Sequence, residues 1–124
     1  MIDGMRAMLA LLMMLLAGSA LADGDAARGE KKFEDCAACH RLEAGANNVG
    51  PSLHGIFGRK AAEIADIRYS PAIKRSAIFW TPETVDKFIT DPQGMVPGNR
   101  MPYAGMASTA NRADLIAYLQ KATK

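Results

Sequence analysis

An excess of charge of one sign is what this chain most clearly lacks. Its 15 lysines and arginines nearly balance 13 aspartates and glutamates, which leaves a formal net charge of +2 over 124 residues. A nucleic-acid-binding domain needs a dense basic patch or stripe, so the balance argues against nucleic acid as a partner. The length indicates one domain.

Long apolar runs are also missing, apart from residues 7–17. This run is too short to cross a bilayer. The basic residue Arg6 precedes it, and a small-residue A-x-A site follows at 20–22. These features predict a cleaved secretory signal peptide at 1–22, a single domain at 23–124, and export with no membrane span after cleavage. An uncleaved N-terminal anchor is the alternative.

Cysteine and histidine are scarce, with two of each, yet three of these four residues lie together. The run Cys36-Ala37-Ala38-Cys39-His40 has the C-x-x-C-H spacing that is typical of c-type haem attachment. The two thiols can form thioethers with the two vinyl groups of haem, and the adjacent imidazole can bind the iron. The motif therefore predicts one haem c, covalently attached through Cys36 and Cys39.

Other uses of two cysteines fit less well. A disulfide that closes so short a loop gains little chain entropy. A redox-active C-x-x-C is expected beside a βαβ pattern, and the sequence shows no convincing strands. A zinc site needs more ligands than these cysteines with His40 and His54 readily supply. Haem attachment remains the favoured interpretation.

Elsewhere the sequence predicts short helices joined by long loops. Gly- and Pro-rich segments at 45–59 and 94–105 indicate loops. Asp25, Ser70-Pro71 and Thr81-Pro82 are helix-start signals, and Asp91-Pro92 disfavours continuation. The expected helices cover 25–37, 70–75, 81–90 and about 109–121. The predicted fold class is all-α, with about four short helices and long loops wrapped around one covalently bound haem, which would complete an otherwise thin core.

One histidine leaves the second face of the iron open. Three methionines follow the expected leader, namely Met95, Met101 and Met106. Met101 lies in the stiff Pro/Gly segment 97–105, and this position favours it as the second ligand, although a loop methionine can simply fill an apolar gap. A second strong ligand favours electron transfer, whereas an open site favours gas binding or catalysis.

Several blocks in a fixed order carry a family resemblance. They cover residues 29–33, 36–40, 49–60, 100–105 and 114–119. With these blocks the chain resembles class I cytochrome c, in its small soluble bacterial form similar to mitochondrial cytochrome c. The resemblance implies the cytochrome c fold, with the first and last helices crossing near Gly29.

The resemblance also implies roles for single residues. Cys36 and Cys39 would carry the thioethers, and His40 and Met101 would bind the iron. The Pro51 carbonyl would accept a hydrogen bond from His40. The residues expected at a buried haem propionate are Arg59, Tyr69 and Trp80. The alternatives are a surface cation for Arg59 and ordinary core aromatics for Tyr69 and Trp80. His54 is expected to be structural.

Two departures from the family pattern have consequences. Phe88 and Ile73 stand where mitochondrial relatives carry a tyrosine and an asparagine, so we expect a drier pocket. The lysines that surround the haem edge in those relatives are mostly replaced by uncharged residues, and Arg100 is the clear basic survivor. Steering of charged partners should therefore be weak. The replacements are Asn48, Gln93, Gly94, Ala107 and Ser108.

The function that the resemblance implies is that of a periplasmic one-electron carrier, not an enzyme. It would act as a monomer through transient contacts. Its partners would be a cytochrome bc complex or dehydrogenase on one side, and a terminal oxidase or reductase on the other. One alternative is an electron-accepting subunit held permanently by a periplasmic dehydrogenase. Another is a haem enzyme or gas sensor with an open iron site.

Overall fold

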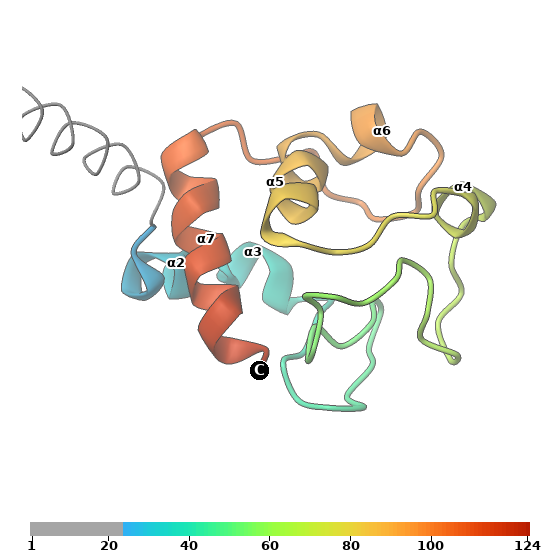
Figure 1. The fold of residues 1–124 in the computed structure, drawn as a ribbon, viewed down its shortest axis with the longest axis horizontal. Coiled ribbons are helices and arrows are strands. Elements are labelled where there is room, and N and C mark those ends of the chain that lie inside the picture. Colours follow the sequence, from blue (N-terminus) through green and yellow to red (C-terminus); the bar gives the residue numbers. More distant parts are fainter. Residues whose placement is uncertain (1–23) are drawn as a thin grey trace, which may run out of the picture.

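A computed structural model describes residues 24–124, and the expected signal peptide at 1–22 lies outside these residues. The described part is helical (Figure 1), as the sequence predicts, and its one recorded β pairing is an isolated bridge between Lys60 and Phe79. No helix within it is both long enough and apolar enough to cross a membrane. In chain order the helices are α2 (Ala26–Lys32), α3 (Glu34–Ala37), α4 (Pro71–Arg75), α5 (Pro82–Thr90), α6 (Pro92–Met95) and α7 (Thr109–Ala122).

Local capping explains where α4 and α5 begin. Ser70 Oγ accepts a hydrogen bond from Ile73 N at 3.1 Å, and proline occupies the first turn of both helices. Thr81 and Thr84 form a reciprocal capping box at the start of α5. These groups satisfy backbone N–H donors that have no partner within the helix. Both predicted starts are confirmed.

The first expected helix, 25–37, is interrupted in the structure. Asp25 caps α2 by accepting a hydrogen bond from Arg28 N at 2.8 Å. At Phe33 the helix gives way to a turn before α3 begins. The amide of Cys36 donates to Phe33 O at 2.8 Å, an i to i+3 bond that tightens the chain compared with an α-helical turn. The interruption lies directly before the two cysteines.

The sequence pattern does not predict helix α6, because Asp91-Pro92 indicates only the end of the preceding helix. It does end α5, but Asp91 also begins a new turn, since its side chain accepts from Gly94 N at 3.0 Å. Pro92 is the first residue of this turn. The same pair therefore stops one helix and starts another, and the loop expected from 94 begins after Met95.

The terminal helices α2 and α7 cross in close contact (Figure 1). A Cβ at Gly29 would lie 1.9 Å from Asp114 O, so only glycine allows this approach. The rings of Phe33 and Tyr118 lie 5.8 Å apart beside the crossing, and Leu115 is only 1% exposed. This is the crossing near Gly29 that the resemblance implied.

A buried carboxylate on α7 reinforces the crossing. Asp114 Oδ1 accepts from the amide of Asp25 at 2.7 Å, and its Oδ2 accepts from Arg28 Nε at 3.0 Å. The hydrogen bond from Arg28 lowers the pKa of Asp114, and the Asp25 amide acts in the same direction. The carboxylate therefore stays ionised at neutral pH and ties the start of α2 to α7.

A second polar contact joins α5 to α7. The Arg112 side chain is 9% exposed, and its Nε lies 2.9 Å from Asp86 Oδ1. Its Nη1 donates to the carbonyls of Met106 and Ala107, both at 2.9 Å. Arg112 thus fixes the last part of the loop that connects α6 to α7.

Replacing Gly29 by alanine tests the helix crossing. The added methyl would meet Asp114 O, and overpacking of this kind costs on the order of 3 kcal/mol. Chemical denaturation of the haem-loaded protein would measure the loss in free energy of unfolding.

Gly45→Ala is the matched control. Gly45 has a φ of 72°, but its Cβ would meet nothing within 4 Å, so only about 1–2 kcal/mol of backbone strain is expected. Equal stability of Gly29→Ala and the wild type would contradict the close crossing.

Candidate haem-binding site

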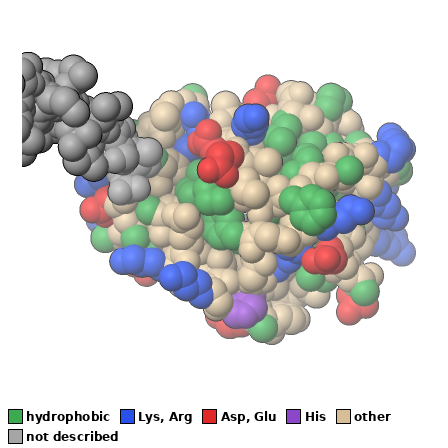
Figure 2. Space-filling model, in the orientation of Figure 1, with side chains coloured by type: hydrophobic (Ala, Val, Ile, Leu, Met, Phe, Trp, Pro, Cys, Tyr) green, Lys and Arg blue, Asp and Glu red, His purple; other side chains and the backbone are tan. Residues whose placement is uncertain are grey.

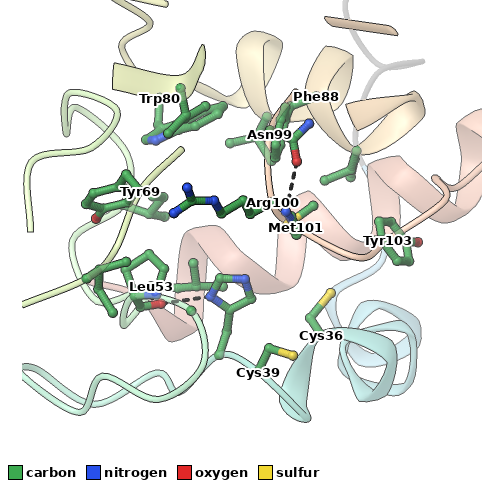
Figure 3. Close-up of a pocket in the computed structure, with 18 of the residues that line it drawn as sticks. Cys36, Cys39, Leu53, Tyr69, Trp80, Phe88, Asn99, Arg100, Met101 and Tyr103 are labelled. Carbon is green, nitrogen blue, oxygen red and sulfur yellow. Dashed lines mark hydrogen bonds between the residues drawn. The ribbon is translucent and has the colours of Figure 1, made fainter. Parts of the chain in front are cut away.

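An apolar cavity lies between the helices and the two long loops. Ile73 of α4, Val85 and Ile89 of α5, and Leu115 and Leu119 of α7 line it. Figure 3 shows Cys36 and Cys39 on one side of this cavity, and Tyr69, Trp80 and Phe88 on the sides away from the two cysteines. Several helices therefore present apolar side chains to one common space.

The C-x-x-C-H run borders this cavity. Cys36 and Cys39 are half-buried free thiols. The amides of Cys39 and His40 both donate to Cys36 O, at 3.1 and 2.9 Å, so the run is a tight turn that continues from α3. Burial raises the pKa of the Cys36 thiol to about 11, and the nearby Asp35 contributes in the same direction. Both thiols line the cavity together with the His40 ring.

The ring of His40 has a defined orientation. Its Nδ1 lies 2.8 Å from Pro51 O, and because a carbonyl oxygen can only accept, Nδ1 carries the proton. Burial lowers the pKa of His40, which favours the neutral imidazole with a free lone pair on Nε2. That is the form that binds a metal.

Glycine at position 50 makes this histidine geometry possible. A Cβ at Gly50 would lie 2.5 Å from His40 Cε1. The amide of Gly50 donates to Cys39 O at 3.0 Å, and the amide of Leu53 donates to Arg41 O at 2.9 Å. These bonds hold the 50–53 segment against the histidine and place the Pro51 carbonyl beside its ring.

Arg59, Tyr69 and Trp80 also line the cavity. Gly58 N donates to Trp80 O at 2.7 Å, and Trp80 N donates to Arg59 O at 2.8 Å, so the backbone holds Arg59 and Trp80 side by side. The Arg59 guanidinium donates to the carbonyls of Ser52, at 2.7 Å, and of His54. It therefore joins this segment to the His40 loop. Burial raises the pKa of the Tyr69 phenol.

Of the three methionines considered from the sequence, Met101 is the one that lines the cavity. Met106 is 7% exposed within the hydrophobic core, and its amide donates to Ile89 O at 2.8 Å. Met95 ends α6 and lines a separate surface hollow with Val96 and Pro97. His54 is exposed and is not among the cavity residues.

Three polar residues that line the same cavity have no role predicted from the sequence, namely Lys60, Arg68 and Asn99. A fourth, Arg100, is predicted only as a surface cation at the haem edge, and it also lines the cavity. Figure 3 shows the Arg100 side chain extending toward the side where Tyr69 and Trp80 lie. No short-range pattern marks these residues, because the fold brings them together from separate loops.

The donor set fits a porphyrin with carboxylate groups. Two thiols and a neutral imidazole lie at the apolar cavity, and the cationic side chains that line it are Arg59, Lys60, Arg68 and Arg100, against the single acid Asp35. Arg59 is half-buried, and the other three cations are exposed. A half-buried cation needs an anionic partner, and two propionates would supply one for Arg59 and further carboxylate oxygens for its neighbours. The fold and the site together define a small helical protein that carries c-type haem.

Comparison with known proteins agrees with this class. The family model described as cytochrome c matches residues 26–123. Cytochrome c2 iso-2 of Magnetospirillum fulvum is 46% identical over 88 residues, which cover 71% of this chain and 92% of that protein. Cytochrome c of Euglena viridis is 42% identical over 98 residues, covering 78% of this chain and 96% of that protein.

A solved structure adds to these sequence matches. Cytochrome cH from Methylobacterium extorquens superposes with a TM-score of 0.74 at 42% identity, covering 79% of this chain and 99% of that one. The chain therefore belongs to the cytochrome c family and has the cytochrome c fold. It binds one haem c, covalently attached through Cys36 and Cys39, and it is a haem electron carrier.

The apolar side chains of Ile73 and Phe88 generate a prediction about buried water. Ile73 is 9% exposed, and the Phe88 ring lies 5.1 Å from the Trp80 ring. Neither side chain has a polar atom, so neither can form a hydrogen bond with water. A high-resolution structure of the haem-loaded protein is expected to show no ordered water among Ile73, Phe88 and Met101. Phe88→Tyr should introduce one, because its hydroxyl needs a partner. Ordered water there in the wild type would contradict the prediction.

Proposed function

We propose that this protein is a periplasmic carrier of single electrons whose haem iron is bound by His40 and Met101. The observation that supports this most directly is that both side chains line one cavity with Cys36 and Cys39. When bound, the haem supplies the one-electron ferric/ferrous couple, and a histidine–methionine pair raises its potential. No substrate bond forms or breaks in this function.

The chain's own residues would keep the site unchanged as an electron arrives and leaves. Pro51 holds the His40 ring in one orientation, and the loop from Val96 to Gly105 holds Met101. The apolar wall of Ile73, Val85 and Leu115 excludes water from that side. A saturated and dry site leaves little to reorganise and no open position for catalysis. We therefore propose that the protein is not an enzyme.

The proposed location depends on the sequence at 1–22, whose leader pattern favours export before haem attachment. As the family resemblance implies, the donor would be a cytochrome bc complex or a dehydrogenase. The acceptor would be a terminal oxidase or reductase. The protein would act as a monomer that meets both partners through small, transient contacts, with no role in nucleic-acid binding.

The mouth of the cavity indicates how those partners would dock. Val49 is 72% exposed and lines the cavity together with Asp35, Arg100 and the exposed Pro102. The expected lysine replacements are all exposed, and all are uncharged: Asn48, Gln93, Gly94, Ala107 and Ser108. Lys74 and Arg75 belong instead to the last turn of α4, at the end of the molecule where basic side chains gather in Figure 2. A partly apolar mouth whose two charged residues, Asp35 and Arg100, are of opposite sign would favour short-range contact over long-range steering.

Substitution of Met101 tests the proposed ligation. The oxidised wild-type protein should show the weak long-wavelength band expected for a sulfur-to-iron bond. Met101→Ala should lose this band and bind carbon monoxide tightly, because one iron face becomes open.

The matched control is Met95→Ala, which removes a half-buried methionine that does not line the cavity. It should keep the band. A Met101→Ala protein that retains the band would show that another group is the ligand.

Salt dependence tests the proposed docking mode. Raising ionic strength from about 0.01 M to about 0.15 M shortens the Debye length from about 30 Å to about 8 Å. We expect the bimolecular electron-transfer rate with an isolated oxidase or bc complex to change less than about threefold, since the mouth carries little net charge. Stopped-flow kinetics would measure it, and a tenfold or steeper fall would contradict weak steering.

A further inference from the structure

The loop that carries Met101 contains a buried polar side chain without an assigned role, that of Asn99. It is 8% exposed and lines the cavity. A buried carboxamide without partners is costly, so its hydrogen bonds show what it holds. Figure 3 shows Asn99 beside Phe88, with its oxygen directed to the amide of Met101.

Each polar atom of the Asn99 side chain has a partner in this segment. Its Oδ1 accepts from Met101 N at 2.9 Å. Its Nδ2 donates to Pro92 O at 2.8 Å and to Val96 O at 2.9 Å. Two carbonyls require a donor and an amide requires an acceptor, so these partners fix which end of the carboxamide is oxygen.

The main chain of Asn99 is held as well. Its amide donates to Val96 O at 3.1 Å, and its carbonyl accepts from Gln93 Nε2 at 2.8 Å. Gln93 Oε1 accepts in turn from Gly98 N at 3.0 Å. One side chain therefore links α6, through Pro92, to the backbone of the residue that faces the cavity.

We infer that Asn99 is the positioning residue for Met101. It contacts the Met101 backbone and fixes where the loop presents this side chain. The inference rests on the proposed ligation by Met101 and goes beyond it, because it names what keeps that ligand in place. Loss of Asn99 should let the loop open more often and admit external ligands, while the rest of the fold remains.

The test compares imidazole binding to the oxidised, haem-loaded wild type, Asn99→Ala and Gly29→Ala. Imidazole can bind only when Met101 is displaced. Asn99→Ala removes three hydrogen bonds, each equivalent to roughly a fivefold change in an equilibrium constant. The apparent affinity for imidazole should rise at least about tenfold, and the sulfur-to-iron band should weaken.

Gly29→Ala is the control for general destabilisation. It should lower global stability through the distant α2–α7 crossing and leave imidazole affinity within about twofold of the wild type. Equal imidazole affinity for Asn99→Ala and the wild type would overturn the inference, as would an equal rise in Gly29→Ala. Absence of the band from the wild type would instead overturn Met101 ligation itself.

Hydrogen exchange in the wild type provides a second measurement if Asn99→Ala fails to fold. The amide of Met101 should exchange slowly, because Asn99 Oδ1 accepts its proton. Exchange at the rate of an unprotected amide would contradict the inference without any substitution. The amide of Met106, bonded to Ile89 O at 2.8 Å, is the protected reference at the other end of the loop.

Discussion

The helices of this protein depend on a cofactor because they are too short to bury one another. The buried faces of α4, α5 and α7 all line the haem cavity, through Ile73, Val85 and Leu115. Helices of five and nine residues, such as α4 and α5, are marginal by themselves in water. The apolar macrocycle is therefore the surface on which they pack, and binding of haem contributes directly to folding.

Long stretches of backbone outside the helices must then find their hydrogen bonds by other means. Arg59 donates to carbonyls of the His40 loop, and Ser52 Oγ donates to Glu43 O at 2.5 Å. In the loop before α7, the Asn99 side chain likewise donates to backbone carbonyls, those of Pro92 and Val96. Side chains that bond to backbone replace secondary structure at the places where the iron ligands are presented.

Signals that are local in sequence were the ones that predicted structure well. Ser70-Pro71 and Thr81-Pro82 begin helices by capping their own first turns, and the cysteine–histidine run carries its chemistry within five residues. Asp91-Pro92 has the same capping chemistry, but it was interpreted only as a stop. The roles suggested for Pro51 and Tyr69 came from family resemblance. Asn99, Lys60 and Arg68 were given no role at the cavity because their partners are set by the tertiary fold.

The crossing of α2 and α7 has a kinetic consequence. The hydrogen bond from Asp25 to Asp114 joins residues 89 positions apart, and closing such a loop costs about 4 kcal/mol in chain entropy beyond a constant term. Because α2 and α7 are the first and last helices of the described chain, a linker from the end of α7 to the start of α2 would shorten the sequence separation of this contact. New termini could then be opened in an exposed loop, which would give a circular permutant with lower contact order.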